Sequence, residues 1–117
     1  MKNYLAIYTG SEQSMARAKW DKLSDDERQA REAEAMQAWG KWVQDHEAAI
    51  VDHGAPLGKT KCVTPDGTQD IRNVMAAYTI VRAETHQAAA EMFVGHPHFT
   101  IFPGDGVEIM ECLPMPG

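Results

Sequence analysis

The sequence contains few of the residues that mark disulfide-rich, zinc-binding or nucleic-acid-binding proteins. Its two cysteines, Cys62 and Cys112, lie 50 positions apart and form no C-x-x-C pair, so neither a disulfide framework nor a zinc site of the usual spacing is expected. Lysine and arginine total 11 against 17 aspartate and glutamate residues, which gives a net charge of −6. Nucleic acids and anionic membrane surfaces attract basic patches, so we expect neither as a partner.

Long apolar runs and catalytic fingerprints are also missing. The first apolar run, from Tyr4 to Tyr8, has five residues, whereas a signal-peptide core needs ~7–15 and a membrane span ~20. None of the three serines stands in a G-x-S-x-G context, and no G-x-G-x-x-G or P-loop pattern occurs. We therefore expect a cytoplasmic protein that works without a cofactor.

The composition that is present fits one globular domain across residues 1–117. Apolar residues make up 44% and charged residues 24% of the chain, which is typical of folded proteins. Ser24 and Glu27 have the S-x-x-E form of a capping box, and Thr85 is a further N-cap candidate. The predicted elements are strands at 4–8, 59–64 and 74–81, helices at 25–53 and 86–94, and extended segments at 99–102 and 107–113.

The order of these elements is strand, helix, strand, strand, helix, strand. This order predicts an α+β fold, a ferredoxin-like βαββαβ antiparallel sheet with both helices on one face. In that arrangement the 59–64 strand and the last strand lie at opposite edges of the sheet. Cys62 and Cys112 would then be three strand spacings of ~4.8 Å apart, which is too far for a disulfide.

The first and third strands are apolar on both of their faces. A sheet that is covered on one side should alternate apolar and polar residues, but Leu5 and Ile7 are as apolar as Tyr4, Ala6 and Tyr8. The chain has no spare element to cover the second face, so we expect a homodimer in which two sheets face each other. The alternative is a monomer in which tyrosine and alanine side chains are partly exposed.

The long helix carries a histidine within its apolar stripe. Met36, Trp39, Val43, His46 and Ile50 recur at spacings of three and four, which places them on one face. Imidazole can take or release a proton near neutral pH, and Trp39 would form an apolar wall beside it. His46 is therefore the predicted catalytic acid or base. The alternative is a core histidine that donates to a backbone carbonyl.

Two further histidines precede the last strand. His96 and His98 are two positions apart, with Asp105 a few residues later, and alternate residues of a strand face the same way, so all three are predicted to contact a ligand. A metal needs a third ligand that the sequence does not fix, so none is predicted, and a structural turn is the other alternative. Tyr8 and Trp39 are predicted to line the same pocket between helix and sheet, although aromatic residues at such spacings also build cores.

Several segments together resemble the YCII-related, or DGPF-domain, family. They are residues 4–8, 52–57, the third strand into 83–85, and the tail from 95–99 through 107–111 to 114–117. The resemblance covers nearly the whole chain and implies a dimeric α+β barrel, a shape that serves heme enzymes, cofactor-free monooxygenases, lactone isomerases and ligand binders. For one branch of the family it also implies a His–Asp pair on or near the first helix, where this sequence has Ala35, Met36 and Gln37.

Two functions follow from these residues. We predict a homodimeric, cofactor-free protein that binds a small molecule and, if it is an enzyme, uses histidine for proton transfer or isomerisation. The alternative is a non-catalytic regulatory or protein-interaction module.

Overall fold

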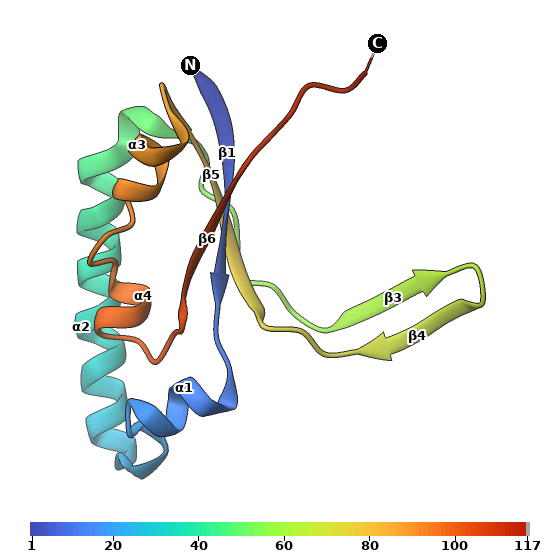
Figure 1. The fold of residues 1–117 in the computed structure, drawn as a ribbon. Coiled ribbons are helices and arrows are strands. Elements are labelled where there is room, and N and C mark those ends of the chain that lie inside the picture. Colours follow the sequence, from blue (N-terminus) through green and yellow to red (C-terminus); the bar gives the residue numbers. More distant parts are fainter. Residues whose placement is uncertain (117) are drawn as a thin grey trace.

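A four-stranded antiparallel sheet lies at the centre of the protein (Figure 1). The computed structural model describes residues 1–116, apart from the side chain of Arg17. The strands of the sheet are β1 (Lys2–Thr9), β2 (Ile50–Asp52), β5 (Met75–Ala83) and β6 (Gly106–Glu111), in the order β2-β5-β1-β6. All neighbours pair antiparallel, and β1 and β5 occupy the centre. The prediction of an α+β fold built on an antiparallel sheet is confirmed.

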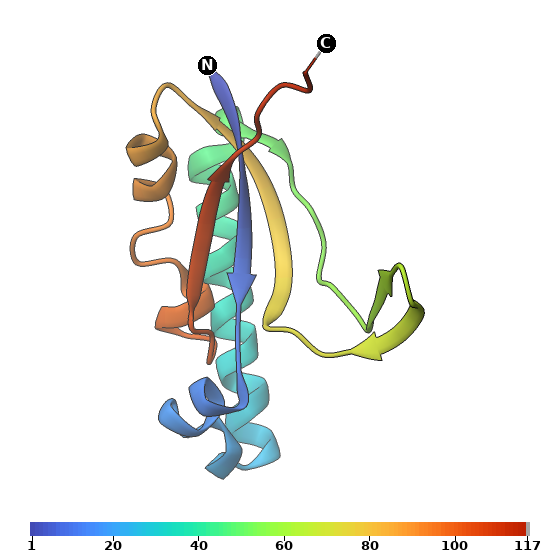
Figure 2. The same ribbon diagram turned by 45° about the vertical axis from the view of Figure 1, so that its right-hand side comes forward.

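The helices α2, α3 and α4 lie on one face of this sheet, with α3 and α4 beside α2 on the side of β6 (Figures 1 and 2). The helices are α1 (Glu12–Arg17), α2 (Asp25–His46), α3 (His86–Glu91) and α4 (Pro97–Thr100), with 3-10 turns at Trp20–Lys22 and Glu47–Ala49. The predicted capping box is present, since the Ser24 hydroxyl accepts from the Glu27 amide and the Glu27 carboxylate accepts from the Ser24 amide. Thr85 caps α3 as predicted. None of the described helices is both long and apolar enough to cross a lipid bilayer.

The predicted end of the long helix at residue 53 is wrong. Helix α2 ends at His46, and Ile50–Asp52 forms the edge strand β2, in which Ile50 pairs with Val81 of β5. Ile50 and Val51 are β-branched and fit a pleated sheet, so pairing with β5 overrides the helical period. The chain then turns at Gly54, whose φ of +73° suits glycine and where a Cβ would overlap the carbonyl oxygen of Tyr78.

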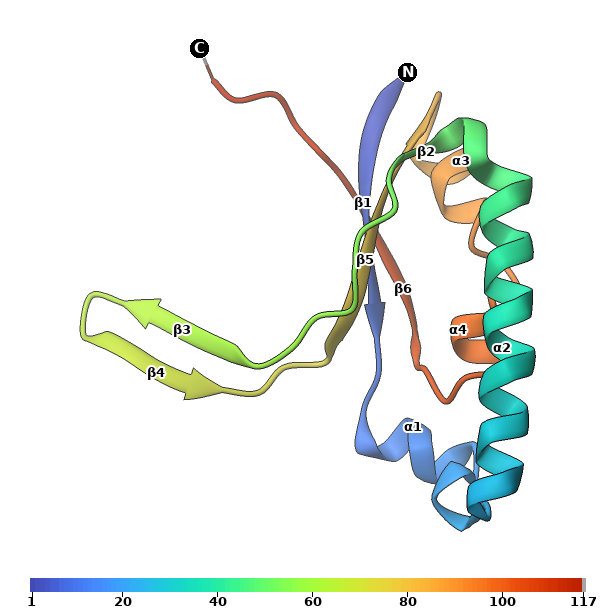
Figure 3. The same ribbon diagram turned by 180° about the vertical axis from the view of Figure 1, so that it is seen from behind.

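The predicted second strand is a strand, but it lies outside the central sheet. β3 (Thr60–Thr64) pairs only with β4 (Gly67–Ile71) in a hairpin that leaves the sheet on the side away from the helices (Figures 1 and 3). Residues 59–64 offer no continuous apolar face to bury, and the turn at 65–66 returns the chain at once. The edge position expected for β3 is taken by β2.

The core fills the space between the sheet and the helices. Its buried members are Tyr4, Ala6, Tyr8, Trp42, Val81, Ala83, Ala89 and Phe93. The face of α2 that packs here is the predicted one in part: Trp39 and Val43 pack against the core, whereas Met36 is 61% exposed and the buried residues are Ala35 and Trp42. The Trp42 indole N–H donates to the carbonyl oxygen of Met92 at 2.8 Å, which fixes the rotation of α2 about its axis.

The region before β6 is helical rather than extended. Pro97 stands at the first position of α4, and the imidazole of His96 accepts a hydrogen bond from the His98 amide as the N-cap of that helix. Proline at the first helical position and a side-chain acceptor at the cap both favour a helix start. The predicted extended segment at 99–102 is therefore wrong. Of the one predicted at 107–113, residues 107–111 lie in strand β6, which ends at Glu111.

The second face of the sheet carries apolar side chains that the rest of the described chain leaves uncovered. We call Leu5, Ile7, Tyr78, Ile80 and Met110 the open sheet face. Leu5 pairs with both Ile80 and Met110, and Ile7 pairs with Tyr78. Four of these side chains are half-buried and Met110 is exposed. The apolar pattern predicted for both faces of β1 and β5 is therefore present.

Candidate functional site

Four of the predicted site residues meet at one place in the core. Tyr8 of β1, Trp39 of α2, and His96 and His98 at α4 form what we call the Tyr8 cluster. Ring centroids lie 4.9 Å apart between Tyr8 and Trp39, 5.2 Å between Tyr8 and His96, and 4.4 Å between Trp39 and His96. The His98 ring lies 5.3 Å from that of Tyr8. The rings fill the space between helix and sheet by packing on one another, so the pocket expected there is occupied by side chains.

His96 is the most deeply buried member of this cluster. Its side chain is 0% exposed, and its Nδ1 accepts the His98 amide hydrogen at 2.9 Å. The neutral ring therefore carries its hydrogen on Nε2, which has no hydrogen-bond partner among residues 1–116. Burial, and then the nearby His98 and His46, lowers the pKa of His96 to about 3. His96 is uncharged near pH 7 and is a poor proton acceptor there.

His98 lies at the border between the core and an open pocket. Its Nε2 donates to the carbonyl oxygen of Thr9 at 2.7 Å, which leaves the lone pair on Nδ1. Burial lowers the pKa of His98, while the Thr9 carbonyl and the charge of Asp105 act in the opposite direction. Gly104 covers the ring so closely that a Cβ there would overlap the imidazole and the His98 carbonyl oxygen. His98 is thus held in one position and one tautomer.

Asp105 lies beside His98 on the loop that leads into β6. Its backbone amide donates to the same Thr9 carbonyl oxygen at 2.9 Å, and its side chain is exposed. The Asp105 carboxylate acts on His98 through its charge. The structure therefore brings Asp105 to the predicted histidines.

His46 is separated from the Tyr8 cluster by Trp42. The Trp42 ring lies 4.6 Å from His46 and 4.8 Å from His96, measured between centroids. The Nδ1 of His46 donates to the Trp42 carbonyl oxygen at 2.8 Å. This is the geometry of the alternative in which His46 is a helix histidine bonded to a backbone carbonyl. Its catalytic role stays a prediction.

Tyr8 is a hydrogen-bond donor rather than a proton shuttle. Its hydroxyl lies 3.1 Å from Thr79 Oγ1, and Thr79 donates onward to the carbonyl oxygen of His53 at 3.2 Å. Burial raises the pKa of Tyr8 to about 12, against the effect of the Thr79 hydrogen bond. The phenol therefore keeps its proton at physiological pH.

A pocket of about 670 Å³ opens next to His98. We call it the His98 pocket. Its lining comes from the end of β1, the start of α1, the segment before β5 and the loop after α4: Gly10, Ser11, Glu12, Gln13, Met15, Arg72, Asn73, Val74, Ala76, His98, Phe102, Pro103 and Gly104. Its apolar lining predominates over its polar lining. Apart from His98, sequence reasoning missed these residues.

One sequence signal could have located the start of α1, which lines this pocket. Ser11 and Ser14 cap α1 reciprocally, since each hydroxyl accepts from the backbone amide of the other residue. An S-x-x-S pair after a strand favours a helix start there, whereas the elements predicted from the sequence include no helix between the 4–8 strand and residue 25. The aromatic residues that were predicted to line a pocket, Tyr8 and Trp39, lie in the Tyr8 cluster and do not line the His98 pocket.

Neither thiol forms a disulfide. The predicted reason was that the two strands lie at opposite edges of one sheet, but Cys62 lies on a hairpin outside the central sheet. Cys62 is half-buried on the projecting hairpin and Cys112 is exposed after β6, and both are free.

Within residues 1–116, no group of three or more histidine, cysteine, aspartate or glutamate side chains is placed to hold a metal ion.

The sheet with helices on one face and the histidine-bordered pocket define a small α+β domain with room for a small molecule. The chain is similar in structure to the 5-chloro-2-hydroxyhydroquinone dehydrochlorinase TftG from Burkholderia phenoliruptrix AC1100, which was solved in complex with 2,5-dihydroxybenzoquinone. The TM-score is 0.53 with 14% sequence identity, over 92% of this chain and 89% of the other. At this identity the similarity shows the fold alone. No family profile and no curated protein matches the sequence.

Proposed function

We propose that this protein is a YCII-like, ferredoxin-like α+β protein that binds a small molecule in the His98 pocket. One observation carries the proposal: a buried histidine, fixed in its Nε2–H tautomer by Thr9, borders an open and mainly apolar pocket. Small-molecule sites are typically apolar hollows with a few fixed polar groups. The structural neighbour TftG is named as an enzyme of a small aromatic substrate, which supports a ligand of comparable size.

His98 is the proposed general acid or base of this site. Its Nδ1 carries the lone pair near pH 7, and the imidazolium that forms on protonation is favoured by the Thr9 carbonyl and the charge of Asp105. His96 binds protons too weakly for this role, and His46 lies behind Trp42. The chemistry that these residues support is proton transfer or isomerisation without a cofactor.

The homodimer remains part of the proposal. The open sheet face is an apolar patch on a side of the sheet that also carries the exposed Asn3, Arg82 and Glu108. A second copy related by a two-fold axis would cover the patch and produce the dimeric α+β barrel that the YCII resemblance implies. The hairpin leaves the sheet on the same side, so it would flank the second copy (Figure 3).

The alternative is a non-catalytic protein-interaction module. The observation that favours it is the packing of the Tyr8 cluster, in which His96 and the neighbouring rings contact one another rather than a cavity. In that case the His98 pocket would bind no small molecule.

A ligand screen followed by NMR distinguishes these functions. Small hydroxylated aromatic compounds, among them 2,5-dihydroxybenzoquinone, are titrated into the ¹⁵N-labelled protein. The proposal expects saturable shifts at the amides of residues 10–13 and 104, which His98→Asn removes while His46→Leu leaves them intact. If His46→Leu abolishes binding, the assignment to His98 is wrong. If no compound shifts these amides, the interaction module is favoured.

A further inference from the structure

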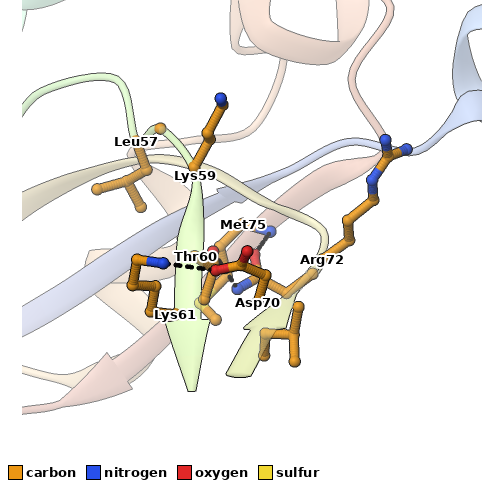
Figure 4. A pocket seen from close by; sticks show the side chains of 10 residues that line it. Leu57, Lys59, Thr60, Lys61, Asp70, Arg72 and Met75 are labelled. Carbon is orange, nitrogen blue, oxygen red and sulfur yellow. Dashed lines mark hydrogen bonds and ion pairs between the residues drawn. The ribbon is translucent and has the colours of Figure 1, made fainter. Parts of the chain in front are cut away.

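A second pocket lies at the base of the hairpin, apart from the Tyr8 cluster (Figure 4). Its volume is about 1030 Å³, and we call it the hairpin pocket. Its lining comes from the segments on the two sides of the hairpin base: Leu57, Gly58, Lys59, Thr60, Lys61, Asp70, Ile71, Arg72, Asn73 and Met75. The pocket shares only Arg72 and Asn73 with the His98 pocket.

The charge of this pocket differs from that of the whole chain. The protein carries a net charge of −6, yet the pocket has three cationic side chains and one carboxylate. Lys61 and Asp70 pair across the hairpin at 2.7 Å and neutralise each other. Within the described part of the chain, Lys59 and Arg72 make no ion pair. The hairpin pocket is therefore lined by two cationic side chains, Lys59 and Arg72, that no carboxylate among the described residues pairs with.

The register of the hairpin brings the backbones of these two residues together at its base. The last pair of the ladder is Thr60 with Ile71, so Lys59 and Arg72 occupy the next position on the two segments. Figure 4 shows their side chains extending from the two sides of the hairpin base. Like charges at facing positions destabilise a pair of strands, and an anion between them would offset that cost.

The base of the hairpin also holds a hydroxyl donor in place. The Asn73 side-chain amide donates to Thr60 Oγ1 at 3.1 Å, and Asn73 Oδ1 accepts from the Met75 backbone amide at 2.9 Å. Because Thr60 Oγ1 accepts from Asn73, its own hydrogen is available to a ligand. Lys59, Arg72 and Thr60 thus offer two charged groups and one neutral donor.

We propose that the hairpin pocket binds a small anion, the carboxylate or phosphate group of a small molecule, between Lys59 and Arg72. Guanidinium and ammonium groups form strong charge-assisted hydrogen bonds with both kinds of group. The site adjoins the His98 pocket through Arg72 and Asn73, which line both, whereas Lys59 and Thr60 line the hairpin pocket and not the His98 pocket.

Inorganic phosphate and acetate, titrated separately into the ¹⁵N-labelled protein at constant ionic strength, test the site. The amides of Thr60 and Lys61, which line the hairpin pocket and not the His98 pocket, should shift and saturate with at least one of the two anions, and the better anion identifies the ligand class. Lys59→Gln and Arg72→Gln should each weaken binding by about fivefold. The control Lys41→Gln removes an exposed lysine that pairs with Asp45 on α2, and it should leave the affinity unchanged.

Two results would overturn the proposal. One is a shift that rises linearly without saturation for both anions, which is the behaviour of a general ionic atmosphere. The other is an unchanged affinity in Lys59→Gln. Neither result bears on the His98 pocket, because Lys59 lies outside it.

Discussion

The helix-covered half of the protein and the projecting hairpin are held in different ways. On the helix side, residues distant in sequence pack together, as when Trp42 bonds to Met92 and Tyr8 contacts both Trp39 and His96. In the hairpin, β3 pairs only with β4, and no hydrogen bond among the described residues joins Thr60–Ile71 to the central sheet. A two-stranded hairpin alone is marginally stable in water.

The comparison shows which parts of the chain specify the fold and which are free to carry surface chemistry. The buried rings of the Tyr8 cluster fix the relative positions of β1, α2 and α4. The molecule, including the hairpin, measures 54 × 43 × 19 Å. The hairpin carries charged side chains outside the core, so these residues can change without disturbing core packing.

Removing Trp42 should have the largest effect on stability. Trp42 is 8% exposed and its N–H bonds to the Met92 carbonyl, so Trp42→Ala leaves a cavity and an unpartnered carbonyl. We expect the free energy of unfolding to fall by about 3–5 kcal/mol in denaturant titrations. Met36→Ala on the exposed face of the same helix should change it by less than about 0.5 kcal/mol. Equal losses would show that the face of α2 described here is not the packed one.

A second pair of variants compares two glycines on either side of the hairpin boundary. Gly54 has a φ of +73° and its absent Cβ would overlap the Tyr78 carbonyl oxygen, whereas a Cβ at Gly58 meets nothing within 4 Å. Gly54→Ala should lower the free energy of unfolding by about 2–4 kcal/mol. Gly58→Ala should be neutral within about 0.5 kcal/mol, and thermal unfolding of both variants gives the comparison.

The third test concerns the open sheet face. Ile80→Asp places a carboxylate at its centre and should weaken the proposed dimer by at least about thirtyfold in sedimentation equilibrium. Val94→Asp introduces the same charge on the helix side of the sheet, where Val94 is 78% exposed, and should leave association unchanged. A wild-type protein that sediments as a monomer at micromolar concentration contradicts the dimer itself.

The fourth prediction is a dependence of stability on pH that comes from His96. Its pKa is about 3 in the folded protein and about 6.5 unfolded. The unfolded state therefore binds the proton more tightly, and the contribution of His96 is fully present above pH 6.5. It is lost as pH falls toward 3, by at most about 1.4 kcal/mol per pH unit.

His96→Asn isolates this contribution, since asparagine keeps an acceptor for the N-cap of α4 without titrating. The fall in unfolding free energy between pH 6.5 and 4.5 should be shallower in His96→Asn than in wild type. The exposed and non-titrating Gln37 of α2 provides the control, and Gln37→Asn should keep the wild-type slope. A wild-type slope in His96→Asn would show that the ring is not desolvated in the folded state.

The sequence predicted those parts of the fold that depend on local chemistry. The Ser24 capping box, the Thr85 cap and the apolar residues on both faces of β1 are recognisable because each needs only neighbouring residues. The edge strand β2 was missed because three residues at a helix exit give no periodic signal, and their pairing with β5 is a distant contact. The hairpin was misplaced because a strand pattern does not say which strand is its partner.

The candidate site was predictable in its buried part only. Tyr8, Trp39, His96 and His98 are the aromatic and imidazole residues that a core at this position would collect, and they do meet. The His98 pocket could not be foreseen, because α1, the segment before β5 and the loop after α4 meet only once the sheet has formed.

The edges of the central sheet limit how the protein can associate with itself. β2 at one edge has only three residues, and β6 at the other presents the exposed carboxylate side chain of Glu108. Short and charged edges discourage strand-by-strand addition, which is the route to open-ended fibres. In the proposed homodimer the two copies would meet through the faces of their sheets, which would cover the open sheet face of both and leave no such surface for a third copy.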